Sequence, residues 1–154
     1  MTIAKLAGAA ALGIGLACLG ASAMATPGLN DRIVSDPSTG IALYGFDPVA
    51  YFTEGKAVRG RRDVEAEWNG AAWRFASEAN RAAFLSSPET YAPRFGGYDP
   101  SAVATGVAVA GHPLIFRIEG ERLYLFHTPQ TRDGFGDLAS AQQSWPKVEA
   151  GLTD

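Results

Sequence analysis

The clearest alternation of apolar and polar positions lies in residues 63–76, on both sides of Asn69-Gly70. Asn-Gly is a preferred two-residue hairpin turn because both positions accept positive φ angles. The pattern therefore predicts a β-hairpin with one apolar face, and it sets Glu65 opposite Arg74 on the other face as a favourable pair. The predicted apolar pairs are Trp68 with Ala71, Ala66 with Trp73, and Val64 with Phe75. We interpret these aromatic side chains as core residues rather than a ligand platform.

A second alternating segment, residues 112–127, predicts another hairpin. A two-residue turn at Glu119-Gly120 would place His112 directly opposite His127. The same register carries two costs, since it sets two arginines opposite each other and gives Glu119 a positive φ. A three-residue turn is the alternative, and it would separate the two histidines. The predicted apolar pairs are Phe116 with Leu123 and Leu114 with Leu125.

Short helices are predicted between and after the hairpins. Ser77 is a suitable N-cap for a helix, and Pro88 suits the first position of another that ends near Ala92. The segment 47–52 predicts a single capped turn, and Thr128-Pro129 predicts a further short helix. A last helical segment, 139–145, is expected to end before Pro146.

These elements predict the fold class α+β: one small domain of two β-hairpins with short capping helices, spanning residues 26–154. Similar residue patterns around the two turns indicate a weak internal duplication. The aligned segments are Trp68-Asn69-Gly70-x-x-Trp73-x-Phe75 and Ile118-Glu119-Gly120-x-x-Leu123-x-Leu125.

Residues 1–25 are typical of a secretory signal peptide. Lys5 precedes an uncharged apolar run of about fifteen residues, which is shorter than the roughly 20 that a spanning helix needs. Small residues around Ala23 and Ala25 then offer cleavage sites, and we expect cleavage after Ala25. The mature protein would be periplasmic or secreted, without a transmembrane segment. A lipoprotein anchored through Cys18 is the alternative.

Charge, cysteine content and the absence of catalytic motifs disfavour several classes of function. The 154 residues carry a formal net charge of −3. This charge disfavours a nucleic-acid partner, because proteins that bind nucleic acids present a basic face. The one cysteine would be lost with the signal peptide, which leaves no thiolate for metal binding or catalysis. No Gly-x-Ser-x-Gly, His-Glu-x-x-His or P-loop motif occurs. We therefore expect a binding protein rather than an enzyme.

Several motifs, in order, resemble the YHS domain family, and most closely its exported single-domain bacterial branch. The motifs that carry the resemblance are Gly45-Phe46-Asp47-Pro48-Val49-Ala50-Tyr51-Phe52, Glu67-Trp68-Asn69-Gly70, Trp73-Arg74-Phe75-Ala76-Ser77, Pro88-Glu89-Thr90-Tyr91-Ala92-Pro93, Gly96-Gly97-Tyr98 and Trp145-Pro146. The resemblance covers most of residues 41–146 and implies a small α+β module.

The resemblance also implies metal handling, since relatives occur beside heavy-metal-transporting ATPases and in some multicomponent monooxygenases. The cysteines associated with metal in such relatives are replaced here by Ala50 and Ala76, and a third cysteine position, after Gly-Gly-Tyr, is occupied by Asp99. The family's usual ligands therefore do not carry over to this chain.

Two kinds of site are predicted from the remaining residues. His112 and His127 are candidate ligands for a divalent transition metal, copper or zinc, and their alternative interpretation is structural. Tyr51, Tyr98, Asp47 and Asp99 are candidate residues for binding a small ligand or an envelope protein. Helix or turn capping would equally explain both aspartates, and loop aromatics would equally close the ends of a small core.

Overall fold

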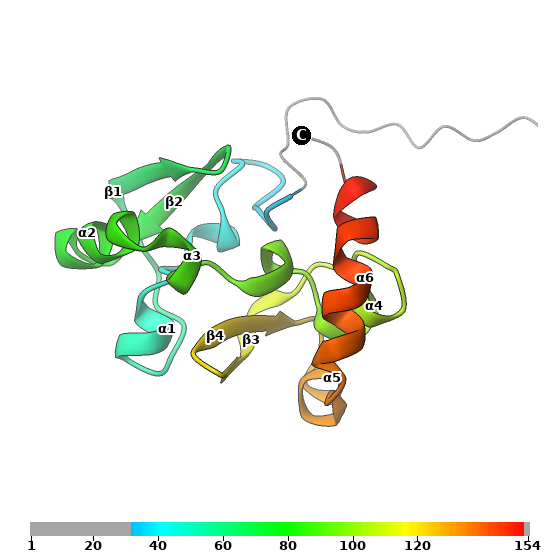
Figure 1. Ribbon diagram of the computed structural model, residues 1–154. Coiled ribbons are helices and arrows are strands. Elements are labelled where there is room, and N and C mark those ends of the chain that lie inside the picture. The colour runs from blue at the N-terminus through cyan, green and yellow to red at the C-terminus, as the bar shows by residue number, and fades with distance from the viewer. Residues whose placement is uncertain (1–31, 153–154) are drawn as a thin grey trace, which may run out of the picture.

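A computed structural model describes residues 32–152 as an α+β fold, as the sequence predicts. Two antiparallel hairpins lie apart from each other with helices around them, and the C-terminal helix stands beside the second hairpin (Figure 1). In chain order the elements are η1 (Leu43–Gly45), α1 (Ala50–Thr53), β1 (Arg61–Trp68), β2 (Ala71–Phe75), α2 (Glu78–Ser86), α3 (Pro88–Tyr91), η2 (Arg94–Gly97), α4 (Pro100–Ala104), β3 (His112–Glu119), β4 (Arg122–Phe126), α5 (Pro129–Gly134) and α6 (Leu138–Ala150).

The first hairpin has the predicted register near its turn. Asn69 and Gly70 both take positive φ, Ala66 pairs with Trp73, and Glu65 pairs with Arg74. The predicted pairing of Val64 with Phe75 is wrong, because an irregularity in β1 brings Arg61 opposite Phe75. Both Val64 and Phe75 are nevertheless buried, so the bulge preserves the apolar face.

The predicted register of the second hairpin is wrong, because the turn lies one residue later in the chain than predicted. Gly120 and Glu121 form the turn, both with positive φ, so that Glu119 pairs with Arg122. This register places glycine first in the turn and replaces an arginine pair by an acid–base pair, which explains why it is preferred. Phe116 consequently pairs with Leu125, and Ile118 pairs with Leu123.

Local capping signals explain the helices. The Ser77 side chain accepts a hydrogen bond from the Asn80 N–H at the start of α2, and Pro88 opens α3 as predicted. The expected end of the last helix before Pro146 is wrong, since α6 continues to Ala150. Burial of Val148 in the core holds the helix together beyond the proline, so packing outweighs the lost backbone hydrogen bond.

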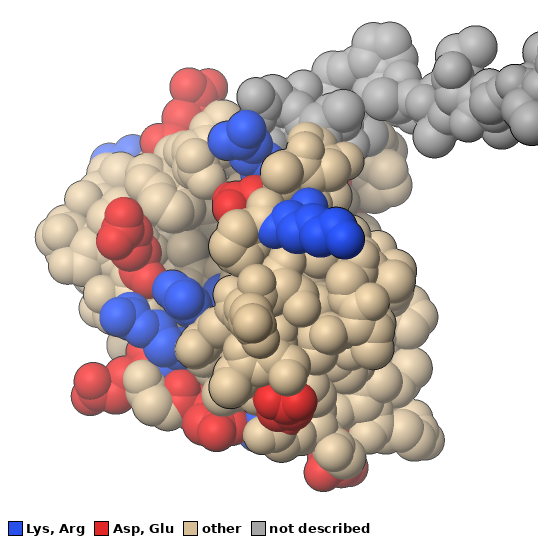
Figure 2. Space-filling view, turned by 45° about the vertical axis from the view of Figure 1, so that its right-hand side comes forward, with Lys and Arg blue, Asp and Glu red and all other residues tan. Residues whose placement is uncertain are grey.

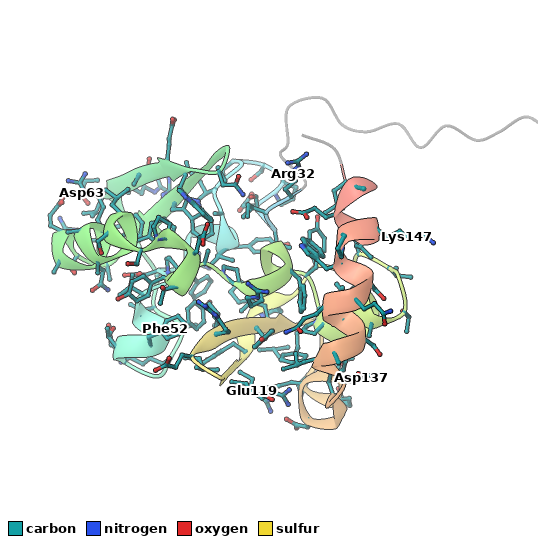
Figure 3. All side chains as sticks on the ribbon, in the orientation of Figure 1. Arg32, Phe52, Asp63, Glu119, Asp137 and Lys147 are labelled. Atoms are coloured by element: carbon teal, nitrogen blue, oxygen red, sulfur yellow. The ribbon has the colours of Figure 1, made fainter. Side chains whose placement is uncertain are left out.

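Two hydrophobic clusters meet at β4. Leu123 and Leu125 pack with the first hairpin and α1, whereas Tyr124 and Phe126 pack with α4 and α6. Alternate residues of a strand point to opposite faces, so this strand serves both clusters. In Figure 3, Phe52 of α1 lies near the β3–β4 hairpin, on the side of the first cluster.

The expected signal peptide and Cys18 lie outside the described residues. Within 32–152, no helix is long and apolar enough to cross a membrane.

Candidate functional site

Asp47 is fully buried and connects three parts of the first hairpin unit, residues 43–86. One carboxylate oxygen accepts the Val49 N–H at 2.8 Å, at the start of α1. The other accepts the Ala76 N–H at 2.8 Å, just after β2, and the Asn80 side-chain amide at 2.7 Å, on α2. The contacts assign Asp47 a structural role, because a buried carboxylate with three donors has little capacity left for a ligand.

Asp99 has the same role in the second hairpin unit, residues 95–134. It is 1% exposed and accepts hydrogen bonds from the Ser101 N–H, the His127 N–H and the Thr131 hydroxyl, at 2.8, 2.7 and 2.7 Å. The Ser101 hydroxyl donates a fourth, at 2.6 Å. Burial raises the pKa of Asp99, but these hydrogen bonds outweigh burial and leave the pKa below its ordinary value.

The two units repeat one another beyond the aspartates. The Gly60 N–H donates to Gly45 O, and the Gly111 N–H donates to Gly97 O, each at 2.9 Å. Both hairpins have an irregularity at the equivalent place in their first strand, between Arg61 and Glu65 in β1 and between His112 and Phe116 in β3. A duplication is predicted from the segments at the two turns, but two further sequence signals of the repeat are missed. They are Gly45-Phe46-Asp47-Pro48 against Gly97-Tyr98-Asp99-Pro100, and Phe75-Ala76-Ser77 against Phe126-His127-Thr128.

The predicted pairing of the two histidines is wrong. His112 pairs with Phe126, and His127 follows the end of β4. The His127 Nδ1 lies 3.0 Å from Ala110 O, and the His112 Nδ1 accepts the Leu114 N–H at 3.2 Å. Within the part of the chain that the structure describes, no three His, Cys, Asp or Glu side chains group together in a way that could hold a metal ion.

Tyr51 and Tyr98 belong to different hydrophobic clusters. Tyr51 is fully buried in the first cluster, where its hydroxyl donates to Pro113 O at 2.9 Å and so joins the two units. Burial, with a contribution from the charge of Asp47, raises the pKa of Tyr51 well above its ordinary value, so its hydroxyl remains a donor. Tyr98 packs against Trp145 in the second cluster, with ring centroids 6.2 Å apart.

A cleft opens where the two units meet, next to the buried Tyr51. We call it the junction cleft; its volume is about 290 Å³, at the lower end of small-molecule sites. The first unit contributes rings and a cation, and the second contributes the start of β3. The lining residues are Tyr44, Phe46, Arg59, His112, Pro113 and Leu114. Leu114 is 58% exposed, so an apolar wall of the cleft faces solvent.

The corresponding corner of the second unit is covered. By the repeat, Gly96 takes the place of Tyr44, Tyr98 that of Phe46, and Ala110 that of Arg59. The Val34 N–H donates to Gly96 O at 2.8 Å, and a Cβ at Gly96 would collide with Arg32 O. The junction cleft therefore lies at the corner of the first unit alone and is not repeated at the equivalent corner of the second unit.

Side chains of both charges lie on the face of the molecule that Figure 2 shows. Figure 2 shows acidic and basic side chains interspersed around a large uncharged area on the face that is turned forward. A groove between Trp68 and Trp145, of about 320 Å³, also includes Glu89 and Arg94. Its lining is mostly polar, whereas that of the junction cleft is mostly apolar. An apolar lining with few polar groups is the usual composition of a small-molecule site.

Comparison with known protein families finds a match that covers most of the first unit. The family model of the YHS domain matches residues 49–95, from the residue before α1 into η2. Residues 49–95 are a YHS domain. Most of the second unit lies beyond the matched span, so the wider resemblance over residues 41–146 extends further than the match. No match was found among curated proteins or among solved structures.

Proposed function

We propose that this YHS domain protein is a non-catalytic binding module that holds a small organic molecule in the junction cleft. Its expected signal peptide would direct it to the periplasm or the exterior. The observation that carries the proposal is the difference between equivalent corners of the two units: one is closed by chain and rings, and the other is open and lined with apolar groups.

The cleft combines a rigid wall with an exposed apolar surface. Phe46 is 8% exposed and Pro113 is buried, and Pro113 is held through its carbonyl by the Tyr51 hydroxyl. A flat apolar ligand would cover the exposed Leu114 side chain, and release of water from that surface favours binding. A preformed wall lowers the ordering cost of binding.

Metal handling, which the family resemblance implies, has weaker support in this chain. Apart from His112 at the cleft, the lining residues offer no imidazole, thiol or carboxylate group. Two histidines without a third ligand make a weak site for copper or zinc. Both metals therefore enter the experiment as competing probes.

The test is a titration of the ¹⁵N-labelled protein with benzyl alcohol, followed by amide chemical shifts. We expect saturable shifts at residues 44–46, 59 and 112–114, with a dissociation constant on the order of 1 mM for so small a probe. Leu114→Trp fills the cleft and should abolish the shifts. Leu85→Trp is the matched control, since Leu85 is similarly exposed but lies on α2 outside the cleft lining.

Two outcomes would overturn the proposal. One is the absence of saturable shifts in the cleft. The other is stoichiometric binding of copper or zinc, by calorimetry, in a protein that does not bind benzyl alcohol.

A further inference from the structure

The positive charge of Arg59 at the junction cleft has no carboxylate partner among residues 32–152. Two other cations of the same segment are paired: Lys56 lies 3.4 Å from Glu54, and Arg61 contacts Asp63. Arg59 instead donates from Nη1 to Tyr44 O at 3.2 Å, and its guanidinium carbon lies 4.6 Å from the centre of the Phe46 ring. These contacts hold the guanidinium in place without neutralising it, and most of its five N–H donors stay available.

His112 adds a second donor to the same cleft. Its Nδ1 accepts the Leu114 N–H, so in the neutral ring the proton lies on Nε2. The lining contains no Asp or Glu side chain. The cleft therefore offers N–H donors and a positive charge beside an apolar wall, with no negative group among its lining residues to repel an anion.

The repeat shows that this charge is an addition at one corner. The residue equivalent to Arg59 in the second unit is Ala110, and both form the isolated strand bridge with the residue just before the buried aspartate. Backbone geometry at this position thus requires no arginine. A cation that the fold does not need, held by an aromatic ring at the mouth of an apolar cleft, points to a ligand with the opposite charge.

We propose that the junction cleft selects small apolar carboxylates, with Arg59 binding the carboxylate group and the wall of Phe46, Pro113 and Leu114 covering the apolar part. This inference rests on the proposed function and adds the ligand class to it. The protein carries a net negative charge, so the preference arises locally at Arg59 and not from the overall field.

The experiment compares benzoate with benzyl alcohol, which share the ring and differ in charge. At low salt we expect benzoate to bind about fivefold more tightly, and the difference to shrink at high salt because the guanidinium is exposed. In Arg59→Gln the preference should fall below about twofold, while the affinity for benzyl alcohol stays within about twofold of the original. Amide chemical shifts report both affinities.

Arg62→Gln is the matched control. Arg62 is an exposed arginine close by in the chain, but it does not line the cleft, so this variant should keep the preference for benzoate. Equal binding of both probes by the unaltered protein would overturn the inference and leave the proposed function standing. Failure of both probes to bind would overturn the proposed function as well. A preference that Arg62→Gln abolishes as fully as Arg59→Gln would show a general charge effect and would also overturn the inference.

Discussion

The two hairpin units share one hydrogen-bond plan but differ in what surrounds them. In the first, β2 buries Ala71, Trp73 and Phe75, while the residues between them, Ala72 and Arg74, are only partly covered. In the second, β4 buries four consecutive residues, because the first unit covers one face and α6 covers the other. The comparison shows that the buried aspartate and the bulged hairpin define the unit, whereas the faces vary with the neighbours.

Loss of the buried carboxylates should have the largest effect on this comparison. Asp47→Ala and Asp99→Ala each leave several buried donors without an acceptor, and we expect each to lower the free energy of unfolding by about 3 kcal/mol or more. Urea denaturation measures both losses. A loss near 3 kcal/mol for one variant and below about 1 kcal/mol for the other would show that the two aspartates are not equivalent.

Smaller losses of stability are expected from substitutions at Gly60 and Gly111, which occupy equivalent positions in the two units. A Cβ at Gly60 would lie 2.5 Å from the Arg74 backbone carbon, and one at Gly111 would lie 2.5 Å from the Leu125 Cβ. Gly60→Ala and Gly111→Ala should therefore each cost about 2 kcal/mol through overpacking.

Gly134→Ala serves as the control for these variants. Nothing lies within 4 Å of the added Cβ, so thermal unfolding should show an unchanged or slightly higher Tm. Equal behaviour of all three variants would remove the close approach as the explanation.

The smallest expected effect is on the pH dependence of stability, compared between Asp99→Asn and the original protein. The folded-state pKa of Asp99 is lowered, so its stabilising contribution is complete above the unfolded-state pKa of about 3.9 and is lost as the pH falls below it. Asp99→Asn should be less stable at neutral pH, but it should lose less stability than the original protein between pH 5 and pH 3, as urea denaturation at each pH would measure. Several exposed aspartates whose pKa values are also lowered contribute the slope that remains in the variant.

The local structure could be predicted well from the sequence, and the long-range structure less well. The Asn69-Gly70 turn, the Ser77 cap and the Pro88 start follow from short-range rules, and all are present. The strand irregularities and the continuation of α6 beyond Pro146 depend on tertiary packing, which alternation alone does not encode.

Of the candidate site residues, His112 lines the cleft, and Tyr51 supports it from behind through Pro113. The meeting of Arg59, Tyr44 and Phe46 with β3 could not be predicted, because it is a contact between segments that lie far apart in the sequence. The cluster of basic residues on the Arg59 loop is visible in the sequence. The ion pairs of Lys56 and Arg61, which Arg59 lacks among residues 32–152, cannot be predicted from the sequence.

The position of β4 between two cores has a consequence for dissecting this protein. A fragment cut at residue 95, where the family match ends, would lose Leu123 and Leu125 and expose the rings that pack against them, and the Tyr51 hydroxyl would lose its acceptor, Pro113 O. The family match thus ends inside a continuous hydrophobic core, and a fragment that keeps both clusters intact has to extend into α6.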